Sequence, residues 1–136
     1  MFFILNWSGE RWRAMMKSEY KGIRRILKAF TYSFDGFKAV FKSEAAFRQD
    51  LLFCFIFAVT FCFLPLTAVA RAFLLFALFL ILFMELINTA IEVIIDRIGE
   101  EYHPLSKTAK DIGSLLVLLS FVHFFAAGAI ILYPLF

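Results

Sequence analysis

The sequence contains little cysteine and none of the short motifs that usually mark phosphate or metal chemistry in soluble enzymes. Its two cysteines, Cys54 and Cys62, are eight residues apart, which on one helix is about 12 Å and too far for a disulfide. No Gly-rich phosphate loop, protein-kinase motif set, Cys/His ligand pattern or nucleophile elbow occurs. We therefore interpret the cysteines as small packing or lipid-facing residues, and we look for an active site among other side chains.

Charged residues are also sparse, at 18% of the chain, whereas apolar residues make up 62% and 20 of the 136 residues are Phe. About half is the usual apolar share of a soluble domain. A soluble protein of this size cannot hide so much apolar surface, because small domains keep a large share of their surface exposed. The composition therefore predicts an integral membrane protein.

The basic residues are concentrated near the N-terminus, since ten of the 14 Lys and Arg residues lie at or before Arg48. The partner that suits this segment is the anionic inner face of a membrane. We do not expect a nucleic-acid partner.

Residues 23–42 predict an amphipathic helix in the membrane interface. The apolar positions of this segment are spaced 3, 1, 3, 4, 3 and 4 residues apart and form one stripe: Ile23, Ile26, Leu27, Phe30, Phe34, Phe37 and Phe41. Its basic residues fall largely elsewhere, which is typical of a helix lying among lipid head groups. A helix packed on a soluble core is the alternative. Residues 1–20 are interpreted as an N-terminal extension, with the native start expected at Met15 or Met16.

Three further segments, about 47–66, 72–95 and 112–135, are apolar and long enough to span a membrane, so 21–136 is predicted to be one all-α membrane domain. The connection after the first span carries only Arg71, whereas the N-terminal segment and the 96–111 connection carry most of the basic residues. The positive-inside rule therefore places the N-terminus and the 96–111 loop in the cytoplasm, and the C-terminus in the periplasm.

Four polar residues of the second span are spaced 3, 4 and 4 apart, and a helix places them on one stripe: Glu85, Asn88, Glu92 and Asp96. Acids inside a span cost several kcal/mol unless they are paired, protonated or hydrated. A protonated Glu85 bonded to a neighbouring helix is the structural alternative. Three acids and an amide in register favour a functional site.

Depth in the membrane separates the expected roles of these acids. Glu92 lies near the cytoplasmic end of its span, where a water-soluble phosphate donor could reach it. Glu85 is seven residues deeper, about 10 Å, and suits a general base for a lipid hydroxyl. Glu44 precedes the first span on the same membrane side as Glu92. Two such carboxylates could hold Mg²⁺ together with phosphate oxygens and water.

The polar segment 100–111 opens the third span and offers groups for a nucleotide. Lys110 could contact phosphate as a point charge, and Asp111 could accept hydrogen bonds from ribose hydroxyls. For His103 the sequence leaves open a surface position or a nucleotide contact.

Four stretches together resemble the prokaryotic diacylglycerol kinase family over residues 23–136: Glu44-Ala45-Ala46-Phe47-Arg48-Gln49, Glu85-Leu86-Ile87-Asn88-Thr89-Ala90-Ile91-Glu92, Asp96-Arg97-Ile98-Gly99-Glu100-Glu101-Tyr102-His103 and Ala109-Lys110-Asp111-Ile112-Gly113-Ser114. The resemblance implies an interfacial helix plus three spanning helices in a bacterial inner membrane. It also implies a homotrimer whose active sites are shared between subunits. The expected reaction moves the γ-phosphate of Mg-ATP onto diacylglycerol and gives phosphatidic acid.

The resemblance also implies roles for single residues. Glu85 would be the general base with Asn88 beside the reacting groups, and Glu44 and Glu92 would bind Mg²⁺ and the ATP phosphates. Further nucleotide contacts would come from Arg25, Tyr32, Glu101, Tyr102, His103, Lys110 and Asp111. The lipid substrate would meet Arg25, Arg48, Glu85 and Ser114.

The chain departs from better-known family members at 107–108 and 115–116. Lys107-Thr108 stands where a Gly-Arg pair is familiar, and Leu115-Leu116 stands where small residues are expected. Two alternatives remain open at this point. Undecaprenol kinase would use the same carboxylates on an isoprenoid alcohol, and a small channel or transporter subunit would use Glu85 and Glu92 to line a polar path.

Overall fold

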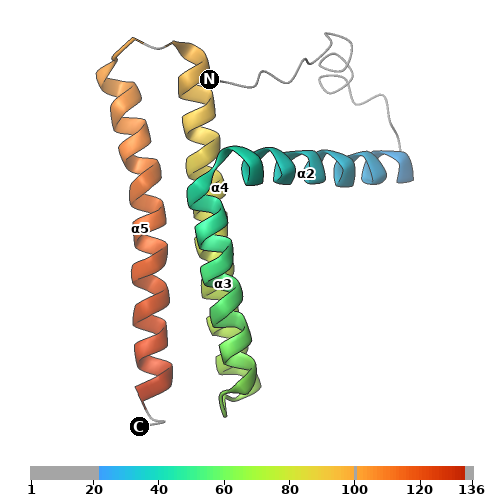
Figure 1. Ribbon diagram of the computed structural model, residues 1–136, viewed down its shortest axis with the longest axis vertical. Helices are drawn as coiled ribbons and strands as arrows, with labels where there is room; N and C mark the ends of the chain where they lie inside the picture. Colours follow the sequence, from blue (N-terminus) through green and yellow to red (C-terminus); the bar gives the residue numbers. More distant parts are fainter. Residues whose placement is uncertain (1–21, 100, 134–136) are drawn as a thin grey trace. The chain divides into compact units, whose positions relative to one another are not determined.

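The computed structural model describes residues 22–99 and 101–133. It has the helices α2 (Ile23–Ser43), α3 (Ala45–Phe63), α4 (Ala68–Ile98) and α5 (Pro104–Leu132) (Figure 1). The described residues contain no strand, so the all-α prediction is confirmed. The chain divides into two compact units, residues 1–39 and 40–136, and each is described by itself. The predicted extension 1–20 lies outside the described residues.

The first unit contains most of α2, whose helical periodicity was correctly predicted. Every residue of its apolar stripe is exposed, and α2 has no buried residue. The hydroxyl groups of Thr31 and Ser33 donate to the carbonyl oxygens four residues earlier, and Lys38 Nζ lies 4.5 Å from the ring centroid of Phe34. The helix therefore presents an unburied apolar face. Its location in a membrane interface stays a prediction.

The second unit contains α3, α4 and α5, each long and apolar enough to cross a membrane. Their 19, 31 and 29 residues correspond to about 28, 46 and 44 Å of helix, against about 30 Å of hydrocarbon. The three predicted spans are therefore confirmed as helices, but their bounds differ from the prediction. α3 ends at Phe63 rather than near residue 66, α4 extends past both of its predicted ends, and α5 begins at Pro104 instead of near residue 112.

The expected loop 96–111 is mostly helical, which corrects its predicted extent. α4 continues to Ile98, and α5 already begins at Pro104. Proline suits the first position of a helix, because its fixed φ is helical and its missing N–H would have no helical partner. His103 precedes it and caps α5, since its Nδ1 accepts a hydrogen bond of 3.2 Å from the backbone N–H of Leu105.

The core of the second unit lies on α4 between the two other spans. Leu74, Ala77, Leu78 and Ile81 are almost fully buried. An aromatic cluster joins α3 to α5: Phe53, Phe57, Phe61, Phe121, Phe124 and Phe125, with ring centroids 4.5 to 6.5 Å apart. Offset and edge-to-face rings of this kind pack favourably. The aromatic cluster explains part of the high Phe content, because these rings fill the space between helices.

The cysteines behave as predicted, since both are free thiols. Cys54 is buried and its Sγ lies 3.4 Å from the carbonyl oxygen of Leu78 on α4, whereas Cys62 is exposed and bonds within its own helix. Cys54 is therefore a packing residue, and Cys62 faces outward.

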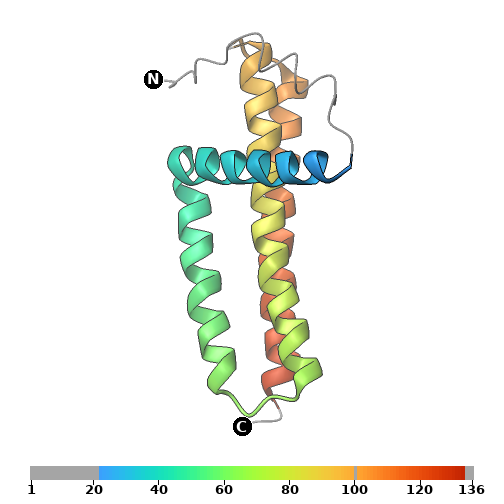
Figure 2. The same cartoon turned by 90° about the vertical axis from the view of Figure 1, so that its right-hand side faces the viewer.

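The connection between α3 and α4 is short (Figure 2), and Arg71 holds it through hydrogen bonds. The guanidinium group of Arg71 donates to the carbonyl oxygens of Phe61, Leu64 and Leu66 at 3.0, 3.3 and 3.5 Å. A cation at the last carbonyls of a helix is favoured by the helix dipole and by hydrogen bonding. Arg71 therefore ties the end of α3 to the start of α4.

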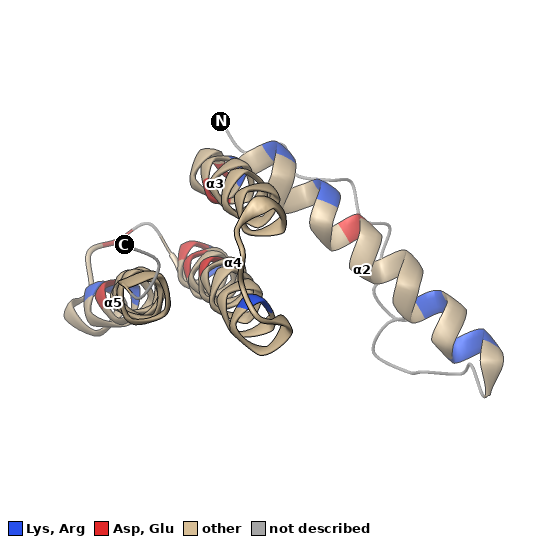
Figure 3. Cartoon of the chain, turned by 90° about the horizontal axis from the view of Figure 1, so that it is seen from below, with Lys and Arg blue, Asp and Glu red and all other residues tan. Residues whose placement is uncertain are grey.

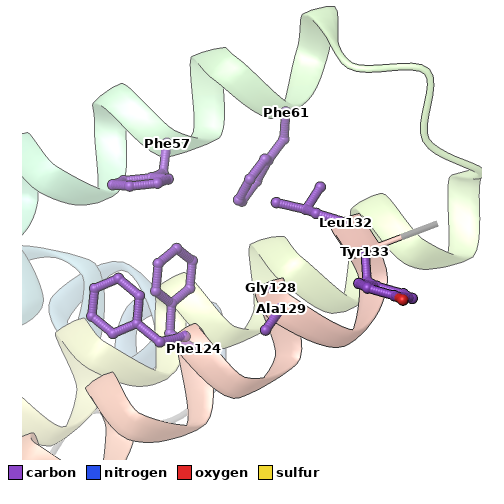
Figure 4. Close-up of a pocket in the computed structure, with 8 residues that line it drawn as sticks. Phe57, Phe61, Phe124, Gly128, Ala129, Leu132 and Tyr133 are labelled. Carbon is purple, nitrogen blue, oxygen red and sulfur yellow. The ribbon is translucent and has the colours of Figure 1, made fainter. Parts of the chain in front are cut away.

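An apolar cavity of about 330 Å³ lies near this same end of the unit (Figure 4). It is lined by Phe57, Phe61, Phe124, Phe125, Gly128, Ala129, Leu132 and Tyr133. None of these side chains is charged, so the cavity has no group that could hold the phosphates of a nucleotide.

Candidate functional site

The contact between Cys54 and Leu78 fixes the register of the antiparallel helices α3 and α4. Glu44 lies ten residues before Cys54, and Asn88 lies ten residues after Leu78. Because each residue advances a helix by about 1.5 Å, Glu44 and Asn88 lie at about the same level. Glu44 therefore falls between Glu85 and Glu92 along α4.

Acidic positions occur on all three helices of this unit when it is viewed along their length (Figure 3). Glu85 is the most deeply buried of the site acids, with 5% of its surface exposed. It interacts electrostatically with Asp50, Glu92 and Glu44. The two helices thus bring four carboxyl groups, from α3 and α4, into one electrostatic neighbourhood.

Asp50 was not predicted as a site residue. It lies four residues before Cys54, which puts it at the level of Leu82, about one helical turn from Glu85. The signal in the sequence was an acid inside the first span, to which the argument used for Glu85 also applies. Only the register of α3 against α4 shows that Asp50 lies within about one helical turn of Glu85.

Asn88 and Glu92 are joined on α4 by a hydrogen bond. The side-chain nitrogen of Asn88 donates to Glu92 Oε1 at 3.1 Å. The other side-chain atom, Asn88 Oδ1, is buried without a hydrogen-bond partner among the described residues. Asn88 therefore directs one end of its amide at a predicted metal ligand.

Lys110 lies opposite Asp96, and its Nζ is 2.5 Å from Asp96 Oδ1. Lys107 pairs in the same way with Asp111 at 2.5 Å, and these two residues lie one turn apart on α5. Both pairs are partly open to solvent, with the Asp96–Lys110 side chains about 40% exposed and the other pair about 60%. The two predicted nucleotide residues thus lie on α5 with counter-ions already in place.

The remaining predicted residues have separate environments. Arg48 Nη1 donates to the carbonyl oxygens of Phe41 and Lys42 at 2.9 and 3.3 Å, and it therefore caps the end of α2. Ser114 is exposed, and its hydroxyl group donates to Lys110 O at 3.2 Å. Glu44 is the N-cap residue of α3, but its side chain makes no capping hydrogen bond.

Other predicted nucleotide residues are not brought to this site by the geometry of the second unit. Glu101, Tyr102 and His103 are exposed between α4 and α5. Arg25 and Tyr32 belong to α2 in the first unit, so their predicted contacts stay predictions.

Mg²⁺ fits the donors of the site by their chemistry. Mg²⁺ prefers one or two carboxylates plus phosphate oxygens and water, and Glu44 and Glu92 are partly exposed carboxylates that the helix register puts about one turn apart. The bond from Asn88 resembles the outer hydrogen bonds that orient metal ligands. Within the described parts of the chain, no three His, Cys, Asp or Glu side chains lie together as a ready metal cluster.

Comparison with known proteins agrees with the ordered motifs. Residues 31–132 match the family described as prokaryotic diacylglycerol kinase. The diacylglycerol kinase of Escherichia coli K12 is 41% identical over 107 residues, which cover 79% of this chain and 88% of that protein. The diacylglycerol kinase of Pseudomonas aeruginosa is 44% identical over 103 residues, with 74% and 84% covered. The one from Haemophilus influenzae is 38% identical over 100 residues, with 73% and 84% covered. The chain belongs to the prokaryotic diacylglycerol kinase family.

Proposed function

We propose that this protein transfers the γ-phosphate of ATP to the hydroxyl group of diacylglycerol and so forms phosphatidic acid. The observation that carries the proposal is the burial of Glu85 in a spanning helix, at 5% exposure, within electrostatic range of Asp50, Glu92 and Glu44. An ionisable group at such a position is costly and marks a functional site by default. The name of the relatives that match over more than four fifths of their length supports diacylglycerol as the alcohol.

Glu85 acts as the general base in this proposal. Its carboxylate takes the proton of the lipid hydroxyl, and the alcohol oxygen bonds to the γ-phosphorus. The bond from that phosphorus to the oxygen bridging to the β-phosphate breaks, and ADP leaves with the electron pair. Glu92 follows Glu85 by seven positions, about 10 Å of helix. This separation suits a lipid alcohol at Glu85 and a water-soluble phosphate donor at Glu92.

Glu44 and Glu92 hold Mg²⁺ in this proposal, and Asn88 orients Glu92 through the bond between their side chains. Bound Mg²⁺ neutralises charge on the transferring phosphate, which with positioning is the main requirement of phosphoryl transfer. When ATP binds in this proposal, Lys110 leaves Asp96 and pairs with a phosphate oxygen. The Asp96–Lys110 ion pair can break because it is partly exposed and of modest strength.

The remaining nucleotide contacts that we propose come from Asp111, Glu101, Tyr102, His103, Arg25 and Tyr32. Arg25, Arg48 and Ser114 lie near the lipid substrate. We also propose a homotrimer with shared active sites, as the family resemblance implies. The distribution of basic residues supports a cytoplasmic N-terminus and a cytoplasmic α4–α5 connection in the inner membrane, with the C-terminus in the periplasm.

Radiolabelled phosphate transfer from ATP in mixed micelles tests the function. Diacylglycerol and undecaprenol are offered separately, and Glu85→Gln is the control for enzyme-dependent labelling. Faster labelling of diacylglycerol by the unmodified chain is the expected result. A strong preference for undecaprenol would keep the mechanism and replace the substrate. No labelling of either alcohol by folded protein would refute the proposal and favour a channel or transporter subunit.

A further inference from the structure

Gly113 is the one glycine among the described residues at which an added Cβ atom would meet a neighbour. It is buried on α5 and faces Asn88 of α4. A Cβ atom at this position would overlap Asn88 Oδ1 and would lie 3.3 Å from Asn88 Cγ. By contrast, nothing lies within 4 Å of a Cβ atom added at Gly128 on the same helix. Only position 113 therefore needs glycine for the approach of α5 to α4.

The side chain that lies against Gly113 is the amide group of Asn88, which is hydrogen-bonded to Glu92. Asn88 Oδ1 is buried against α5 without a hydrogen-bond partner in the described part of the chain, whereas the amide nitrogen donates to Glu92 Oε1 at 3.1 Å. A buried polar atom without a partner is unfavourable, so the surroundings must hold the amide in this orientation. The close contact with Gly113 supplies that constraint.

We propose that Gly113 is a positioning residue for the metal ligand Glu92 and acts through Asn88. The absence of a side chain at position 113 lets the Asn88 amide lie against the α5 backbone, with its N–H groups directed along α4 toward Glu92. The bond then fixes the Glu92 carboxylate before the metal and nucleotide arrive. This inference rests on the proposed function for the role of Glu92, although the contact itself does not.

A methyl group at position 113 has one predictable local effect. It occupies the space of Asn88 Oδ1, so the amide must turn or the two helices must separate. Turning the amide breaks the 3.1 Å bond to Glu92, whereas separating the helices removes the contact with α5 that holds the amide in this orientation. Partners that orient metal ligands typically contribute about 10- to 100-fold in metal affinity or activity. Glu92 should therefore bind metal less well although no ligand atom has been removed.

The test compares Gly113→Ala with Gly128→Ala, which is the same change on the same helix at an open position. Mn²⁺ is the probe, and its binding is followed by electron paramagnetic resonance with a non-hydrolysable ATP analogue and no lipid. Gly113→Ala should weaken Mn²⁺ binding by about tenfold or more. Gly128→Ala should match the unmodified chain. The KM for diacylglycerol should change less than twofold in both variants, because neither glycine is among the residues proposed to bind the lipid.

Asn88→Ala separates positioning from general damage to the fold. In that background the clash is gone, so adding Gly113→Ala should cause no further loss of Mn²⁺ binding. Should Gly113→Ala fail to fold, the double variant should fold, because the space is restored. Equal losses in both backgrounds, a double variant that also fails to fold, or unchanged Mn²⁺ binding in Gly113→Ala would each overturn the proposal. Unmodified protein that binds Mn²⁺ with nucleotide but labels no diacylglycerol would count against the proposed function alone.

Discussion

Replacing Glu85 by Gln should lower activity steeply without lowering stability. The change keeps the size and shape of the side chain but removes the group that accepts the proton. General-base catalysis typically contributes about 10²- to 10⁴-fold, which corresponds to about 2.7–5.5 kcal/mol in the activation barrier. We therefore expect kcat to fall by at least a factor of about 100.

The stability of the same variant should move in the other direction or not at all. Glu85 has 5% of its surface exposed and shares its surroundings with Asp50, Glu92 and Glu44. A neutral amide relieves any repulsion between these acids, and burying an amide costs far less than burying a charge. A gain of about 1 kcal/mol would raise the melting temperature by roughly 3–6 °C for a chain of this size.

The assay pairs phosphate transfer in mixed micelles with thermal unfolding in the same detergent. Ser120→Ala is the control, because Ser120 is also a buried polar residue of a span, but its hydroxyl group donates to Val117 O on its own helix. Its kcat should stay within twofold of the unmodified chain. A Glu85→Gln variant with normal kcat would refute the base assignment. A variant that loses activity and melts much earlier would show that Glu85 is a structural hydrogen-bond donor.

Three further changes test separate parts of the molecule. Glu92→Gln should lower the rate and raise the Mg²⁺ concentration that gives half-maximal activity, and an unchanged Mg²⁺ profile would contradict its metal role. Replacing both Cys54 and Cys62 by Ala should keep activity within about threefold with a modest loss of stability, since only Cys54 is buried; an inactive but well-folded variant would show a role beyond packing. Arg71→Gln should destabilise the protein by about 1–3 kcal/mol, because its removal leaves carbonyl oxygens at the end of α3 without a charged donor. Unchanged thermal unfolding of Arg71→Gln would argue that water replaces the guanidinium group there.

The parts of the fold that follow from local periodicity could be predicted from the sequence. The apolar stripe of α2 and the three apolar segments each became a helix. The stripe from Glu85 to Asp96 lies on one continuous helix, as its spacing requires. Helix ends were predicted less well, because the polar composition of 104–111 resembles a loop. Pro104 and the His103 cap nevertheless start α5 there.

Features that depend on the register between helices could not be predicted from the sequence. Asp50 is near Glu85 only because Cys54 packs at the level of Leu78. Gly113 could be read as a small residue for helix packing, but its specific neighbour, Asn88, follows from the distance between α4 and α5. Sequence spacing describes one helix at a time, whereas these contacts join two helices.

The distribution of interactions along α4 gives a reason for the position of Glu85. The segment from Leu74 to Ile81 holds four of the six buried residues of α4, and the aromatic cluster and Arg71 lie toward the same end of the unit. Beyond it the contacts become polar and partly solvated, as in the Asp96–Lys110 pair. Glu85 stands one turn after Ile81, at the boundary between the two regions. Because α4 continues through this boundary without a break, the packed region holds the proposed base in place. The ion pairs beyond it are partly exposed and of modest strength, as the proposed exchange of Asp96 for a phosphate oxygen requires.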